Sequence, residues 1–194
     1  QADLGGKFAV EADGTFTFAQ VGDGSYALSA DRSTADSGNA ISSADALAAL
    51  RIAVGANPNQ GTSLAVSPYQ FIAADANEDG RITSADALAI LRMAVKSPLA
   101  PAQKWLFVSE SVDLWNGGAG GSGLGGTAGG WDSGLGNVQV QGGDAAVNLV
   151  GVLRGDVNGS WAAPAGSTDL DVTNPGYFQA LADQLGVPTD VWGV

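Results

Sequence analysis

The sequence contains no cysteine and no histidine, and these two absences exclude several classes of chemistry. Without cysteine there is no disulfide scaffold, no thiolate metal site and no thiol nucleophile. Without histidine there is no catalytic triad with an imidazole base. The three lysines, Lys7, Lys96 and Lys104, stand in no catalytic motif. We therefore predict that the protein is not an enzyme.

Positive charge is also scarce. The chain has 8 basic residues against 20 acidic ones, a formal net charge of -12. A chain this acidic repels nucleic-acid phosphates and anionic membranes, so we expect no nucleic acid as a partner. No apolar run reaches the ~18 residues that a membrane-spanning helix needs, so we expect no membrane insertion. The same acidity suits a protein that binds cations.

An internal repeat is the clearest feature that the chain does contain. Residues 41–54 recur as residues 82–95 at an offset of 41, with 11 of 14 positions identical. Each copy predicts a short helix, because large apolar residues recur at i, i+3 and i+7. These residues are Leu47, Leu50 and Val54 in the first copy and Leu88, Leu91 and Val95 in the second. We expect the two leucine stripes to pack against each other.

Residues 75–86, directly before the second helix, have the spacing of a calcium-binding loop. Calcium takes about six to eight oxygen ligands. Positions 1, 3 and 5 of the loop carry side-chain oxygens, position 6 is glycine, position 7 offers its carbonyl and position 12 is a carboxylate. In that order the residues are Asp75, Asn77, Asp79, Gly80, Arg81 and Asp86. We predict that calcium binds here.

The segment before the first helix is a weaker version of this loop. With Asp45 at position 12, Asp36 falls at position 3, and these two are its only clear ligands. Two interpretations stay open. Either the loop holds calcium with more carbonyl and water ligands, or it only packs against its counterpart.

A third candidate loop begins near residue 155. Asp156, Asn158 and Ser160 repeat the alternating oxygen spacing, and Asp169 or Asp171 could close the site. The alternative interpretation is a plain turn at the Asp-Val-Asn-Gly sequence.

The regions that flank the repeat predict strands. Alternating residues and Asp-Gly turns favour strands at 8–11, 15–18 and 25–30, and further strands are expected at 104–108, 138–141 and 146–153. A glycine-rich loop is expected at 117–136 and a short helix at 174–186. We predict an α+β fold in which both flanks build a small β-sandwich-like body with the helix pair inserted. We expect four parts: a β segment at 1–31, the helix pair at 32–97, a β segment with the glycine-rich loop at 98–160, and a tail with the short helix at 161–194.

Taken together, residues 32–97 resemble a type I dockerin, with the match best at 75–96. The flanking strands are similar to carboxypeptidase-regulatory-like or prealbumin-like domains of bacterial surface proteins, where the end of such a domain precedes a dockerin. The resemblance implies calcium-dependent folding and docking onto a cohesin-like partner through the helices. The implied recognition positions are Ser43, Ala44 and Arg51 in one copy and Ser84, Ala85 and Arg92 in the other.

The expected function is therefore an extracellular or cell-surface module for docking or self-assembly. The last residues, 190–194, are similar to the ends of type I secretion substrates. The first strands look like the end of a β-domain, whose exposed edge a second copy could complete to form a filament. A carbohydrate-binding module is the alternative, because five tryptophans lie in the second half of the chain.

Overall fold

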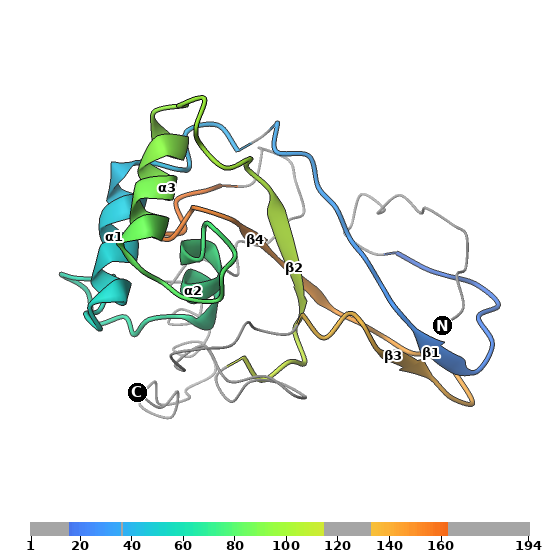
Figure 1. The fold of residues 1–194 in the computed structure, drawn as a ribbon. Coiled ribbons are helices and arrows are strands. Elements are labelled where there is room, and N and C mark those ends of the chain that lie inside the picture. The colour runs from blue at the N-terminus through green and yellow to red at the C-terminus, as the bar shows by residue number, and fades with distance from the viewer. Residues whose placement is uncertain (1–15, 36, 115–132, 163–194) are drawn as a thin grey trace.

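The computed structural model describes residues 16–35, 37–114 and 133–162 (Figure 1). In chain order these form β1 (Gly24–Tyr26), α1 (Ser43–Ala53), α2 (Pro68–Ala74), α3 (Ser84–Ala94), β2 (Trp105–Ser109), β3 (Val138–Val140) and β4 (Leu149–Leu153). Figure 1 shows α1 and α3 side by side at one end and the β1–β3 ribbon at the other. No helix in this part of the chain is long and apolar enough to cross a membrane.

The two copies of the repeat form α1 and α3, as predicted, and both helices begin in the same way. Ser42 and Thr83 are the N-caps, and each accepts a hydrogen bond from a backbone N–H of the first turn. Asp45 and Asp86 return a hydrogen bond to the backbone of the cap, which completes a capping box. Helix starts in the two repeats are therefore fixed by identical local chemistry.

The leucine stripes do not pack against each other, and this prediction is wrong. Leu47 and Leu88 are each 48% exposed, and Leu50 and Leu91 are each 41% exposed. The buried faces carry alanines with a few larger residues instead: Ala46, Ala48, Ala49 and Ile52 in α1, and Ala87, Ala89, Ile90 and Met93 in α3.

The rotation of each helix explains the reversal. Asp45 and Asp86 are fully buried, because each turns inward to meet a loop. Residues at i+3, i+4 and i+7 from an inward-facing residue share its face. These are Ala48, Ala49 and Ile52 in α1 and Ala89, Ile90 and Met93 in α3. The leucines lie on the opposite side and stay in solvent.

Two antiparallel strand pairs accompany the helices in the described residues. β2 pairs with β4, with Trp105 opposite Leu153 and Ser109 opposite Leu149. β1 pairs with β3, with Gly24 opposite Val140. The structure is thus a small mixed protein compatible with the predicted α+β class.

The predicted strands at 104–108, 138–141 and 146–153 match β2, β3 and β4 within a few residues. The strand expected at 25–30 is shorter, and residues 16–18 are not part of a strand. The strand at 8–11, the helix at 174–186 and most of the glycine-rich loop lie outside the described residues.

The core lies between the helices and the β2–β4 pair. Ile72, Val108, Val152 and Val157 are each 0–1% exposed. Trp105 and Trp161 are also buried, with their ring centroids 4.9 Å apart at 83°.

The guanidinium of Arg32 stacks on both tryptophan rings, 4.9 Å from the centroid of Trp105 and 4.8 Å from that of Trp161. These two tryptophans are core residues and offer no open face to a sugar. The other three, Trp115, Trp131 and Trp192, lie outside the described residues.

Candidate metal centres

The loop between α2 and α3 is organised around the carboxylate of Asp75. The backbone N–H of Asp79 donates to Oδ1 of Asp75 at 3.1 Å, and that of Gly80 donates to Oδ2 at 3.0 Å. Gly80 has φ +78°, which glycine adopts without strain. Asp75 is only 7% exposed, so its carboxylate lies inside the loop that it organises.

Asp86 closes this loop from the first turn of α3. Its Oδ2 accepts from the backbone N–H of Thr83 at 2.9 Å, and its Oδ1 accepts from the backbone N–H of Asn77 at 3.2 Å. The same carboxylate therefore caps the helix and holds the loop. The predicted positions 1, 3 and 12 are brought together.

The middle of the loop is turned partly outward. Asp79 accepts from the backbone N–H of Arg81 through Oδ1 and from the side-chain amide of Asn77 through Oδ2, both at 2.9 Å. Within the described chain, no three acidic side chains converge on one point as they stand. Asn77 and Asp79 are exposed, so both can rotate toward Asp75 and Asp86 without disturbing the core.

A second loop, after β4, repeats the hydrogen bonds that Asp75 and Asn77 accept in the first loop. The backbone N–H groups of Ser160 and Trp161 donate to Oδ1 and Oδ2 of Asp156 at 2.9 and 2.8 Å. The N–H of Ser160 also donates to Oδ1 of Asn158 at 2.9 Å, as that of Asp79 does to Asn77. Asp156, Asn158 and Ser160 thus correspond to Asp75, Asn77 and Asp79.

The carboxylate that closes the second loop comes from α1. The backbone N–H of Asn158 donates to Oδ1 of Asp45 at 2.9 Å, across 113 residues of sequence. Oδ2 of Asp45 accepts from the backbone N–H and hydroxyl of Ser42 at 2.8 and 2.9 Å. Asp45 therefore closes this loop in the same way that Asp86 closes the loop 75–86.

Sequence reasoning identified every one of these residues but paired two of them differently. It placed Asp45 at the end of its own preceding segment, with Asp36, and left Asp169 or Asp171 to close the loop at Asp156. Asp36, Asp169 and Asp171 lie outside the described residues. The sequence did contain a signal for the observed pairing. The segment before Asp45 had few ligands of its own, and the loop at Asp156 had no helix carboxylate to close it.

Burial makes these carboxylates costly to ionise. Desolvation raises the pKa of Asp156 to about 6, and the nearby charge of Asp45 adds to the increase. Desolvation also raises the pKa of Asp45. The pKa of Asp75 is raised by desolvation, with additional repulsion from Asp86 and Asp79. A bound cation would relieve this desolvation and repulsion.

The donor set suits a hard divalent cation. Both loops offer carboxylate, amide, hydroxyl and backbone carbonyl oxygens, which are ligands of calcium. The chain has no sulfur or imidazole ligand from cysteine or histidine, so the softer transition metals lack their usual partners. The residues therefore fit calcium at Asp75, Asn77, Asp79, the Arg81 carbonyl and Asp86, and at their counterparts in the second loop.

Four of the six predicted recognition residues lie near the helix starts and face outward. Ser43, Ala44, Ser84 and Ala85 are exposed in the first turns of α1 and α3, whereas Arg51 and Arg92 are partly buried. Arg51 donates to the carbonyl of Pro58 at 3.3 Å.

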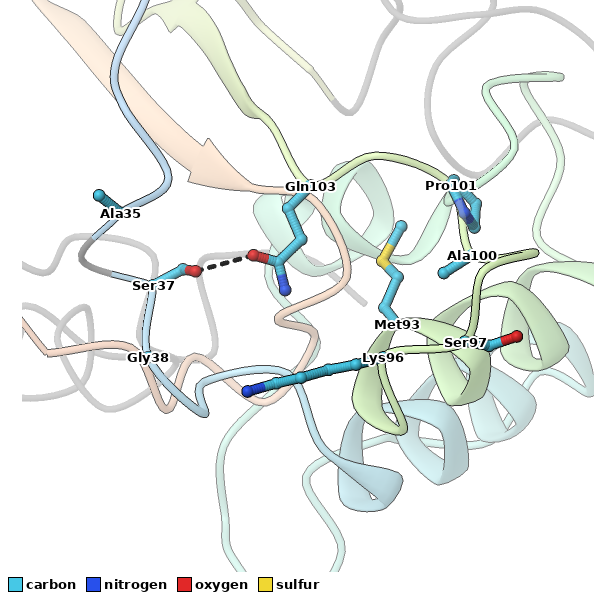
Figure 2. A pocket seen from close by; sticks show the side chains of 9 residues that line it. All are labelled: Ala35, Ser37, Gly38, Met93, Lys96, Ser97, Ala100, Pro101 and Gln103. Carbon is cyan, nitrogen blue, oxygen red and sulfur yellow. Dashed lines mark hydrogen bonds between the residues drawn. The ribbon is translucent and has the colours of Figure 1, made fainter.

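A hollow of about 570 Å³ lies near the end of α3, shown in Figure 2. Met93, Lys96 and Gln103 contribute to its wall, and Gln103 accepts from the hydroxyl of Ser37 at 2.8 Å. Among the lining residues that the structure describes, Lys96 is the one charged side chain.

Comparison with known proteins gives no relative. No protein-family model matches the chain, and neither the curated proteins nor the solved structures contain a match.

Proposed function

We propose that the protein is a calcium-stabilised module that docks onto a protein partner through the outer faces of α1 and α3. The observation that carries this proposal is the equivalence of the two helices. Each carries in its first turn a fully buried aspartate that closes an oxygen-rich loop, and each presents an exposed leucine stripe.

Calcium would act at the loops as a structural ion. It would be held at one site by the loop 75–86 and at the other by Asp45 with Asp156, Asn158 and Ser160. Asp45 and Asp86 lie in the first turns of α1 and α3. An ion that neutralises these two carboxylates would hold the first turns of both helices in place. It would thereby hold the outer faces of the helices in one orientation.

The docking face consists of Leu47, Leu50 and Val54 of α1 with Leu88, Leu91 and Val95 of α3. Val54 and Val95 are 78% and 67% exposed, so the stripe runs along the whole of both helices. Exposed apolar groups in a contiguous patch mark interaction sites more often than they mark accidents of folding. Ser43 and Ala44 extend this face at the start of α1, and Ser84 and Ala85 extend it at the start of α3.

The partner that we propose is a cohesin-like module or a second copy of this chain, in an extracellular or cell-surface setting. Self-assembly could use the leucine face or completion of a strand edge into a filament. We also keep the prediction that the strand pairs belong to a sandwich-like body formed by both flanks. An acidic, cysteine-free chain with structural calcium suits that setting.

Calorimetric titration of chelator-stripped protein with calcium tests the function. We expect two ions per chain and a large rise in melting temperature. Asp75→Asn and Asp156→Asn are each expected to remove one ion, while Asp144→Asn, at an exposed acid outside both loops, is the control. Absence of binding at millimolar calcium would contradict the proposal.

Sedimentation at increasing protein concentration, with calcium, identifies the partner. A rise in mass that Leu50→Glu with Leu91→Glu abolishes indicates a second copy on the leucine face. A rise in mass that these variants leave unchanged points to the strand edge. A monomer at all concentrations excludes self-assembly and leaves a different protein as the partner.

A further inference from the structure

The chain from the end of β4 to Trp161, residues 154–161, contacts both candidate calcium sites. We call this segment the clasp. Its first residue, Arg154, is 6% exposed and lies beside the loop 75–86. One guanidinium nitrogen donates to the carboxylate of Glu78 inside that loop, and another donates to the carbonyl of Ala102. Glu78 also pairs with Lys104 at 2.6 Å.

The next residue of the clasp is fixed to the entry of the same loop. The backbone N–H of Gly155 donates to the carbonyl of Ala73 at 2.8 Å, two residues before Asp75. Gly155 has φ +97°, and a Cβ there would lie 2.9 Å from the sulfur of Met93 and 3.1 Å from Ile41. The backbone therefore passes through a gap that only glycine fits.

The remaining residues of the clasp build the second site. Asp156 organises the second loop, and the N–H of Asn158 reaches Asp45. The hydroxyl of Ser160 donates to the carbonyl of Ala40 at 2.8 Å. The side-chain amide of Gln70, in α2, donates to the carbonyl of Val157 at 2.8 Å. A shift of the second loop therefore moves a backbone that is also attached to α2.

We propose that the clasp couples the two sites, so that calcium at one site raises the calcium affinity of the other. This inference rests on the proposed function. An ion at the second site fixes Asp156 against Asp45 and so holds Arg154 and Gly155 in place. These residues in turn hold Glu78 and the entry of the loop 75–86. The cost of ordering the clasp is met once, by whichever ion binds first, and the second ion binds to a segment already in position.

Calorimetry on the full chain gives the coupling factor. We compare the wild type with Asp156→Asn and with Asp75→Asn, each of which leaves one site intact. We expect the remaining site in each variant to bind calcium about 5-fold or more weakly than it does in the wild type beside a filled neighbour. Coupling between two sites is reciprocal, so the two variants must give the same factor.

Glu78→Gln tests the clasp itself. The side chain of Glu78 is 44% exposed and the change keeps its shape, while the buried Arg154 keeps its hydrogen bond to the carbonyl of Ala102. It removes the ion pair with Arg154, and we expect both sites still to fill while the coupling factor falls toward one. Glu110→Gln is the control, because Glu110 is an exposed acid that bonds Asn148 instead of the clasp.

A second readout follows the site at Asp156 with terbium. Terbium takes the same oxygen ligands as calcium and emits when a nearby tryptophan absorbs light. Trp161 belongs to the second loop, so an ion there is sensitised directly, and Asp156→Asn gives the emission that comes from the first site. The Asp75→Asn variant lacks the first site. We expect its second site to need a higher terbium concentration for half-maximal emission than the second site of the wild type.

Two results separate the coupling from the function. If the wild type binds no ion, the proposed function fails. If the wild type binds two ions and each site keeps its affinity when the other is lost, the coupling is wrong and the calcium function stands. A coupling factor that Glu78→Gln leaves unchanged assigns the coupling to the α1–α3 contact and overturns the role of the clasp.

Discussion

The reversed helix faces give a direct prediction for two adjacent residues of α3. Ile90 is fully buried, whereas Leu91, the next residue, is 41% exposed. Ile90→Ala and Leu91→Ala place the same residue at neighbouring positions of one helix, so the change in helix propensity nearly cancels between them. The difference between the two variants reports burial.

The magnitudes follow from what each truncation removes. Ile90→Ala removes three buried carbon groups, at about 0.8 kcal/mol each, and leaves a cavity between α3 and its neighbours. The expected loss in the free energy of unfolding is about 3–4 kcal/mol. Leu91→Ala opens no cavity and removes carbon already partly in water, so we expect a loss of about 1 kcal/mol or less.

Urea unfolding in saturating calcium, followed by circular dichroism, measures both values. With a slope of about 2 kcal/mol per molar urea, the midpoint should fall by roughly 1.5–2 M for Ile90→Ala and by under ~0.5 M for Leu91→Ala. Equal losses, or a larger loss for Leu91→Ala, would refute the assigned rotation of α3. The proposed docking face would then be lost with it.

Three further predictions concern the clasp and the loops. Gly155→Ala should cost about 1–3 kcal/mol of unfolding free energy, because its Cβ meets Met93 at a positive φ, whereas Gly22→Ala, with open space around it, should have little effect in the same urea assay. The pKa of Asp156 is raised to about 6 in the calcium-free fold, so its stabilising contribution is full below the unfolded pKa and is lost as pH rises through 6. This group should therefore make calcium-free protein about 1 kcal/mol more stable at pH 5 than at pH 7.5, and Asp156→Asn should remove that contribution in chelator-treated melts, while the raised pKa values of Asp45 and Asp75 leave a remainder. Thr83→Ala should cost about 1 kcal/mol and weaken calcium binding at the first site in calorimetry, while Thr83→Ser should restore both.

The sequence predicts the helices and the first loop because their signals are local. The repeat marks both helices, and the caps, the acidic position 12 and the glycine at position 6 all lie within a few residues of one another. The strands β2 and β4 are equally visible, since each is a short apolar run bounded by turns. The sheet partners could not be assigned, because pairing depends on residues far apart in sequence.

The faces of the helices were misjudged because the most hydrophobic stripe was taken to be the buried one. That rule works when a helix is oriented by apolar burial alone. Here Asp45 and Asp86 are buried by their hydrogen bonds to loops, and they turn the alanine faces inward with them. Small residues then allow α1 and α3 to approach closely. The leucines are left outside, where a partner can use them.

The discontinuous second site demands more of the fold than the first. The loop 75–86 holds its ligands within a short segment, whereas Asn158 meets Asp45 across 113 residues. Closing the longer connection costs about 2 kcal/mol more in chain entropy. The clasp makes three hydrogen bonds that need no ion. Gly155 donates to Ala73, Val157 accepts from Gln70, and Ser160 donates to Ala40. At about 1 kcal/mol each, they offset that cost. These bonds offset the closure cost alone, so the cost of ordering the clasp itself is left to the ions that we propose.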